Sequence, residues 1–203
     1  SVLLNRPQAS KQDLEALHQS LYRNVRGRDG EAGRLRTSLI WLGPKGSTAQ
    51  DAPYVPPAPE QLHQHVGSLS EFLKQASDWP RVVHAALSYY QAESLQPFLD
   101  GSGRIARILL VNSLADEDAH SSAVLLRPSL LWTKNTAQHF GQLQMLREHG
   151  SFETWISVFA KSIEQSCSEA AELINRVTAW LAQTRRKVSE ELPNQRHIAM
   201  AIL

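Results

Sequence analysis

Apolar residues recur at three- and four-residue intervals along most of the chain, which is the spacing of amphipathic helices. Ser10 and Asp13 predict a helix start, and the first helix is expected over residues 11–26. Helices are also expected over residues 60–76 and 81–95, where apolar positions gather on one side. The pattern therefore predicts a mainly α-helical protein.

The same spacing continues in the second half of the chain. A shorter helical region is expected around residues 128–148, and Ser151 is then placed to cap a long helix. We interpret the long helix as an amphipathic core helix or helix pair, with a coiled-coil arm of a homodimer as the alternative. Cys167 lies on it and is expected to be a small packing residue. The recurring apolar positions are Phe152, Trp155, Ile156, Phe159, Ile163, Ala170, Leu173, Ile174, Val177, Trp180 and Leu181.

One region departs from helical spacing and carries strand-prone residues instead. Thr37, Ile40 and Trp41 favour strands, and residues 43–47 form a turn cluster of glycine, proline and small polar residues. We therefore expect a small β-hairpin over about residues 34–56, attached to the helical body.

A loop marked by proline and glycine connects the helix over residues 81–95 to the next apolar helix. Gly101 and Gly103 allow another group to approach the backbone closely, and the free N–H groups of a helix start favour anions. Phosphate is the natural ligand of such a loop. Gly-x-Gly alone also fits an ordinary turn between helices.

Charged residues beside the two glycines favour the phosphate interpretation. Arg104 and Arg107 are one turn apart on the same predicted helix, so both guanidinium groups can reach a ligand above the loop. Asp100 is placed to hold Mg²⁺ between phosphate oxygens. The loop therefore predicts a site for a nucleotide with its magnesium ion.

Residues 96–107 read Gln-Pro-Phe-Leu-Asp-Gly-Ser-Gly-Arg-Ile-Ala-Arg. This stretch resembles the signature of the Fic family, His-x-Phe-x-[Asp/Glu]-Gly-Asn-Gly-Arg-x-x-Arg, and differs from it at two defined positions. Arg36-Thr37 and Trp41-Leu42-Gly43 resemble the family's flap hairpin, and Tyr54-Val55-Pro56-Pro57 resembles the exit from that flap. The likeness extends over about residues 8–165.

The resemblance implies a Fic-type helical bundle with a small β-hairpin flap. Residues 1–165 would be the Fic core, with the flap over about 34–56, and residues 166–192 the C-terminal long helix. Residues 193–203 resemble the start of a winged-helix module that some relatives append, of which only the first helix is expected here. The inhibitory helix that many relatives carry has no matching stretch in this sequence.

The resemblance also implies an activity, which is transfer of AMP from ATP to a hydroxyl group of a target protein. Phe98 would be the buried anchor of the loop, and Asp100 would hold Mg²⁺. The target would dock on the flap like an added strand. The nucleotide phosphates would contact Gly101, Ser102, Gly103, Arg104 and Arg107, and the docking edge would be Leu39, Ile40 and Trp41.

Gln96 stands where the family's signature has the histidine that acts as general base. An amide cannot take up a proton near neutral pH, and general-base catalysis is typically worth about 10²–10⁴ in rate. Ser102 replaces the signature's asparagine, whose side chain supports the loop. We therefore expect an impaired adenylyltransferase, with a non-catalytic regulatory or protein-interaction module as the alternative. Transfer of another phosphate-linked group also stays open.

The overall charge narrows the partners. Lys and Arg total 21 against 20 Asp and Glu, so the net charge of +1 gives no field that draws the chain to nucleic acid or to a membrane. A nucleic-acid partner is expected only through an appended winged-helix module. No run of about 18 apolar residues marks a membrane span. The single cysteine excludes an internal disulfide and favours a cytoplasmic location.

Overall fold

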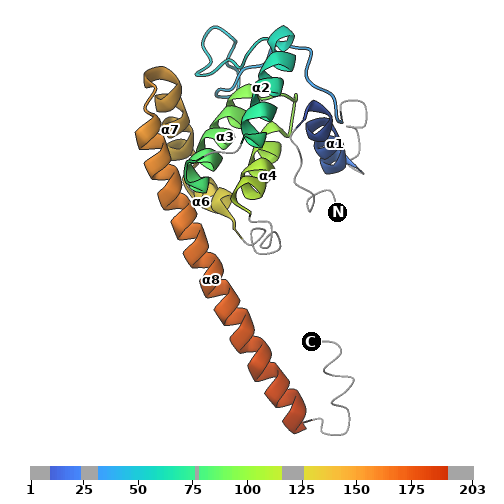
Figure 1. Ribbon diagram of the computed structural model, residues 1–203, viewed down its shortest axis with the longest axis vertical. Helices are drawn as coiled ribbons and strands as arrows, with labels where there is room; N and C mark the ends of the chain where they lie inside the picture. The colour runs from blue at the N-terminus through green and yellow to red at the C-terminus, as the bar shows by residue number, and fades with distance from the viewer. Residues whose placement is uncertain (1–9, 24–31, 76–77, 116–125, 192–203) are drawn as a thin grey trace.

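The computed structural model describes residues 10–23, 32–75, 78–115 and 126–191, apart from the side chains of residues 129–131 and 191. The protein is helical throughout these ranges, which confirms the predicted class (Figure 1). The elements are α1 (Lys11–Tyr22), the 3₁₀ turn η1 (Pro59–Gln61), α2 (Leu62–Lys74), α3 (Arg81–Leu95), α4 (Ser102–Leu114), α6 (Pro128–Lys134), α7 (Thr136–His149) and α8 (Phe152–Glu191).

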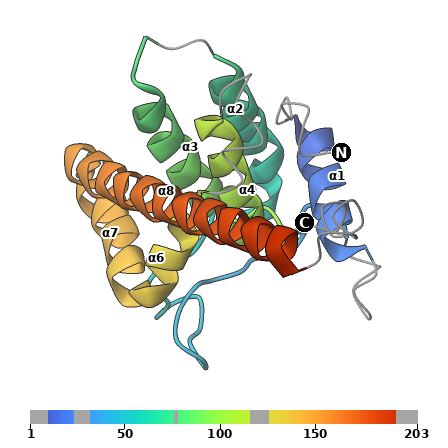
Figure 2. The same cartoon turned by 90° about the horizontal axis from the view of Figure 1, so that it is seen from below.

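Helices α3 and α4 form the centre of the molecule. Helix α2 packs on α3, α1 contacts α2 and α4, and α8 packs on α3, α6 and α7 (Figures 1 and 2). Ala85, Ala86 and Ala92 are buried on α3, and such small side chains let neighbouring helices approach closely. The close packing brings Trp155 of α8 against α3, where its indole Nε1 donates a hydrogen bond to the Ala86 carbonyl at 3.0 Å.

The predicted start of the first helix is confirmed by its capping. The Ser10 hydroxyl accepts a hydrogen bond from the Asp13 N–H, and the Asp13 carboxylate accepts one from the Ser10 N–H. The helix ends at Tyr22, earlier than the predicted residue 26, and residues 24–31 lie outside the described ranges.

The predicted flap is present as a loop, and the predicted hairpin strands are wrong. A single antiparallel bridge joins Leu42 to Tyr54, and no extended strand lies within the described part of the chain. Backbone N–H and carbonyl groups that would pair between strands instead form hydrogen bonds with nearby side chains in local turns. Trp41 donates to the Ser47 carbonyl at 2.7 Å, and the Asp51 carboxylate caps Thr48. Prolines at several positions also remove the N–H groups of a regular ladder.

Helix α8 is one continuous helix of 40 residues, about 60 Å long at 1.5 Å per residue. It runs without a break through residues 165 and 166, where the predicted domain boundary lies. Its first half packs on the body through Trp155, Phe159 and Ile163, while its second half extends away from the body (Figure 1). Cys167 is exposed, so its predicted packing role is wrong: it lies on the outer face of α8, whereas the nearby Ser166 and Ala170 are buried.

Two further expectations concern the limits of the described chain. The winged-helix start predicted at residues 193–203 lies outside the described ranges. None of the helices in the described ranges combines the length and apolarity needed to cross a membrane.

Candidate functional site

The site begins where α3 ends. Gln96 caps this helix in the left-handed conformation, with φ 41° and ψ 60°, and Pro97 then prevents the helix from continuing. The Gln96 side-chain amide turns back and donates to the Glu93 carbonyl and to the Glu93 carboxylate Oε2, both at 2.8 Å. The side chain at the position of the signature histidine is therefore a bound hydrogen-bond donor.

Gly101 is the N-cap of helix α4 and has φ 81°. A Cβ atom at this position would lie 2.8 Å from the hydroxyl oxygen of Tyr22, so the close approach of α1 requires glycine. As a glycine, the N-cap residue Gly101 has no side chain with which to cap this helix start. The first N–H groups of a helix have no partner within the helix, and the predicted anion site depends on these groups.

Ser102 supports the loop from inside. Its hydroxyl accepts from the Phe98 N–H at 2.9 Å and donates to the Phe98 carbonyl at 3.0 Å, and the residue is 3% exposed. The predicted phosphate contact of Ser102 can therefore come from its backbone N–H and not from its hydroxyl in this conformation. The predicted burial of Phe98 is confirmed.

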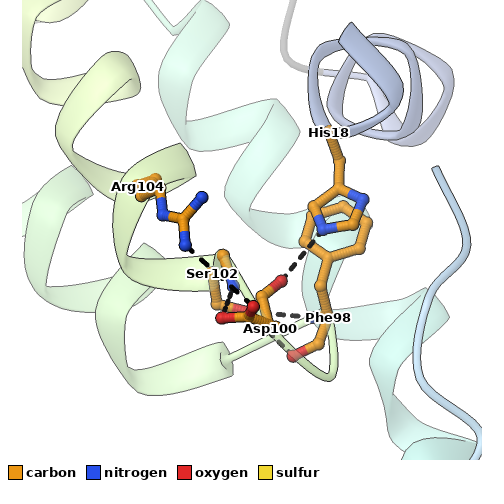
Figure 3. A network of polar contacts seen from close by, with 6 residues as sticks. His18, Phe98, Asp100, Ser102 and Arg104 are labelled. Carbon is orange, nitrogen blue, oxygen red and sulfur yellow. Dashed lines mark hydrogen bonds and ion pairs between the residues drawn. The ribbon is translucent and has the colours of Figure 1, made fainter. Parts of the chain in front are cut away.

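His18 of α1 connects the first helix to the loop (Figure 3). Its Nδ1 accepts from the Gly33 N–H at 2.9 Å, so its Nε2 carries the proton and donates to the Asp100 carbonyl at 2.9 Å. Its ring stacks on Phe98, with centroids 3.9 Å apart. Burial lowers the pKa of His18, which favours this neutral form. The sequence analysis did not predict a role for His18. The one sign of it in the sequence is that a polar histidine lies on the apolar side of the first helix.

Asp100 and Arg104 lie beside the helix start. One carboxylate oxygen of Asp100 accepts from the Gly101 N–H at 2.7 Å, and the other lies 4.0 Å from the Arg104 guanidinium. Arg104 also lies over the Tyr22 ring, 5.4 Å from its centroid. The described residues contain no cluster of three or more His, Cys, Asp or Glu side chains that could hold a metal. Mg²⁺ would thus fit here only as an ion shared between Asp100, water and nucleotide phosphates, which is its common mode.

Arg107 has different neighbours from Arg104, although the two share a helix. An Arg107 nitrogen and both Glu93 carboxylate oxygens lie within 3.5 Å of the point where a Cβ of Gly103 would be. Burial raises the pKa of Glu93, and the nearby positive charge of Arg107 opposes that rise. The loop of residues 96–107, called the motif loop below, therefore has a buried carboxyl group and a guanidinium group beside Gly103. The sequence analysis did not assign a role to this acid.

Arg36 ties the flap to the end of α3. Its buried guanidinium donates to the carbonyl oxygens of Gln96 and Ser38 at 2.8 and 3.1 Å, and also to that of Pro57. Its backbone N–H donates to the Pro97 carbonyl at 2.9 Å. One side chain thus fixes both ends of the flap against the motif loop.

The flap residues proposed to dock a target are accessible. Leu39 is 47% exposed and Trp41 is 44% exposed, and Ile40 between them is half-buried. The exit of the flap is fixed by Tyr54, whose hydroxyl donates to the Ser94 carbonyl at 2.8 Å and whose ring lies 3.7 Å below the Arg147 guanidinium. The flap is therefore positioned by side chains even though it lacks strands.

Comparison with known proteins identifies the family. The profile of the Fic/DOC family matches residues 8–114, which include α1, the flap, the motif loop and α4. The chain belongs to the Fic/DOC family. It is 28% identical over 162 residues to a protein adenylyltransferase Fic of Nematostella vectensis, and 24% identical over 179 residues to the protein adenylyltransferase fic-1 of Caenorhabditis briggsae. These matches cover 76% and 81% of the chain but 30% and 31% of the relatives, so the chain spans about a third of their length.

Solved structures of Fic proteins share the fold. A Fic family protein from Desulfovibrio desulfuricans superposes with a TM-score of 0.69 at 18% identity, covering 89% of this chain and 53% of that protein. The BepC protein of Bartonella tribocorum, solved with AMPPNP bound, gives a TM-score of 0.51 at 16% identity and covers 74% and 72% of the two chains. At these identities the likeness concerns the fold.

Proposed function

We propose that this Fic-family chain binds a magnesium-complexed nucleotide at residues 96–107 and derives from protein adenylyltransferases. The observation that carries the proposal is the start of α4, a helix N-terminus whose N-cap Gly101 has no capping side chain, with Asp100 and Arg104 next to it. Backbone N–H groups, a helix dipole and a guanidinium are together the chemistry that holds phosphate. The adenylyltransferase relatives and the AMPPNP-bound fold neighbour agree with ATP as the nucleotide.

Catalysis by this site is impaired in our proposal. The Gln96 amide donates both of its recorded hydrogen bonds to Glu93 and has no basic lone pair to accept a proton. His18 lies near the loop, but both of its ring nitrogens are already occupied by Gly33 and Asp100. Nucleotide positioning can then persist while proton transfer is lost.

Calorimetry with Mg²⁺-ATP tests the binding site. We expect binding to the unsubstituted chain, and about 10-fold or greater weakening in Arg104→Ala, since a charge-assisted hydrogen bond contributes about 1.5–3 kcal/mol. Arg176→Ala removes an exposed arginine on α8 and is the matched control, with unchanged affinity expected. Absence of ATP binding, or equal binding to all three proteins, would count against the proposal.

Transfer itself is tested with labelled ATP. We expect Gln96→His to raise self-modification by as much as about 10²–10⁴ over the unsubstituted chain, because it restores a general base. The Gln96→Asn variant keeps an amide and serves as control. Mass spectrometry of the product distinguishes AMP from another phosphate-linked group. A Gln96→His variant that binds ATP but modifies nothing would remove the catalytic part of the proposal.

A separate observation favours the alternative function, a protein-interaction module. The alternating three- and four-residue spacing of a coiled coil is followed on the free half of α8 by Ile174, Val177, Leu181, Thr184 and Val188. Acidic side chains lie around the middle of this helix, and a basic cluster follows before its acidic last residues, Glu190 and Glu191. We infer that a second copy would lie antiparallel, with opposite charges adjacent. The acids are Glu164, Glu169 and Glu172, and the bases are Arg185, Arg186 and Lys187.

Size-exclusion chromatography with light scattering tests this pairing. We expect a dimer for the unsubstituted chain and a monomer for Val177→Glu, which puts a charge on the apolar stripe. Asn175→Glu adds the same charge at an exposed position beside the stripe and should leave the dimer intact. A monomeric unsubstituted chain would refute the pairing.

A further inference from the structure

A cavity lies between α6, α7 and α8, outside the motif loop and the flap. Its volume is about 520 Å³, which is within the range of small-molecule sites. Its walls come from the end of α6, the first turns of α7 and the packed half of α8. The lining residues are Trp132, Lys134, Asn135, Gln138, His139, Gln142, Trp155, Val158, Phe159, Lys161, Ser162 and Gln165.

The lining has a definite chemical character. Aromatic rings form one part of it, with Trp132 stacked on His139 at a centroid distance of 4.6 Å and an interplanar angle of 12°. Two lysines and several side-chain amides supply hydrogen-bond donors, and no carboxylate is among the described residues that line the cavity. One of the two lysines, Lys134, forms an exposed ion pair with Glu169 at 3.9 Å. The positive charge offered to a ligand is therefore mainly that of Lys161. Flat rings beside cationic donors suit a planar aromatic anion.

A chain of side-chain hydrogen bonds leads from this cavity to the motif loop. His139 Nε2 lies 3.0 Å from the Tyr89 hydroxyl, and that hydroxyl lies 3.2 Å from Glu93 Oε1. The other Glu93 oxygen accepts from the Gln96 amide at 2.8 Å. Tyr89 is 1% exposed, so these side chains, and not bulk water, satisfy its hydroxyl. Four side chains therefore connect the cavity wall to the position of the signature histidine.

The Tyr89 hydroxyl has one proton and two candidate acceptors. If His139 carries its proton on Nε2, it donates to the Tyr89 oxygen, and Tyr89 donates to Glu93. If His139 carries its proton on Nδ1, Tyr89 donates to Nε2, and Glu93 loses that donor. Because His139 is one of the lining residues, a ligand that accepts a hydrogen bond from its Nδ1–H would select the second arrangement. The Gln96 amide then becomes the main donor to Glu93.

We propose that the cavity binds a planar aromatic carboxylate and that its occupancy changes the hydrogen bonding of Gln96 through His139, Tyr89 and Glu93. This proposal does not depend on nucleotide binding or transfer. Ligand binding to the cavity is measured on the tryptophan indole signals, and its effect on the motif loop is measured on the Gln96 side-chain amide signal. In this way a ligand bound away from the motif loop would affect that loop, because the two hydrogen-bond arrangements of the Tyr89 hydroxyl link the two sites.

Nitrogen-15 NMR of the full chain tests both halves of the proposal. The five tryptophan indoles report on different regions, with Trp132 and Trp155 at the cavity, Trp41 in the flap, Trp79 just before α3 and Trp180 on the free half of α8. We expect 2-naphthoate to shift the signals of Trp132 and Trp155 saturably and to shift the side-chain amide of Gln96. The uncharged 2-naphthamide should bind at least about 5-fold more weakly, as should 2-naphthoate to Lys161→Gln.

The coupling is tested by Tyr89→Phe, which removes the central hydroxyl and keeps the ring. Naphthoate should still shift Trp132 in this variant and no longer shift the Gln96 amide. Tyr90→Phe is the matched control and should keep both responses. Glu93→Gln interrupts the next link and should also lose the coupling. Equal shifts at all indoles, no saturable shift at Trp132 and Trp155, or an unchanged Gln96 response in both Tyr89→Phe and Glu93→Gln would overturn the proposal.

Discussion

Replacing Ser102 by alanine tests whether the motif loop is held from inside by one hydroxyl. The hydroxyl accepts from the Phe98 N–H and donates to the Phe98 carbonyl, in a site that is 3% exposed. Alanine leaves the buried N–H of Phe98 without this acceptor, and an unsatisfied buried polar group costs about 1–3 kcal/mol. We therefore expect the free energy of unfolding of Ser102→Ala to fall by that amount.

The matched control is Ser113→Ala in the same helix. The Ser113 hydroxyl donates to the Leu109 carbonyl at 2.8 Å, one turn earlier in α4, so its loss orphans no N–H group. Alanine also has a helix propensity better than that of serine by about 0.5 kcal/mol, which offsets the lost hydrogen bond. The change in unfolding free energy of Ser113→Ala should therefore stay within about 0.5 kcal/mol.

Urea unfolding followed by far-ultraviolet circular dichroism measures both variants, and calorimetry measures their ATP affinity. Because Ser102 positions the start of α4, its alanine variant should also bind Mg²⁺-ATP more weakly than Ser113→Ala does. Unfolding free energies that agree within about 0.5 kcal/mol between the two variants would refute the assigned role of Ser102.

Three further predictions concern other contacts around the site. Arg36→Met should lower the unfolding free energy by at least about 3 kcal/mol in urea, because several buried carbonyls lose a charged donor, whereas the exposed Arg34→Met should change it by under about 0.5 kcal/mol. Gly101→Ala should destabilise the protein and weaken ATP binding in calorimetry, since φ is 81° and a Cβ would meet Tyr22; full stability would contradict the geometry. Burial, with Arg107 and Arg147 nearby, lowers the pKa of His139 from 6.5 to about 4, so the unfolded chain binds more protons between these values and stability rises with pH there. His139→Gln should therefore show a shallower rise in melting temperature between pH 4 and 6.5, and an unchanged slope would contradict this origin.

The sequence predicted the elements whose signals are local. The capping box at Ser10 and Asp13 and the helix over residues 81–95 depend on spacing within one or two turns, and both are present in the structure. The motif loop was recognised because its glycines, proline and arginines lie within one stretch of twelve residues, 96–107. Burial of Phe98 was implied by the resemblance of the same stretch to the Fic signature.

Features that depend on distant segments could not be predicted in this way. His18 contacts Asp100 across 82 positions of the chain, and Arg36 contacts Gln96 across 60. A histidine or arginine in a helical or loop pattern carries no sign of such a partner. The hairpin prediction was wrong for a related reason, because strand-prone residues form strands only when their backbone groups pair. Here prolines and local turns prevent all but the bridge between Leu42 and Tyr54.

The left-handed backbone of Gln96 has a genetic consequence. Few residues other than glycine tolerate positive φ, but histidine and asparagine are among those enriched there, so an imidazole at this position would meet no new backbone strain. Glutamine and histidine codons differ in a single third base. A single nucleotide change can therefore restore the histidine, and the backbone at this position would accept it. A population carrying this gene would contain both forms at the ordinary rate of point mutation. A screen for gained self-modification among random single-base variants would be expected to return this position repeatedly.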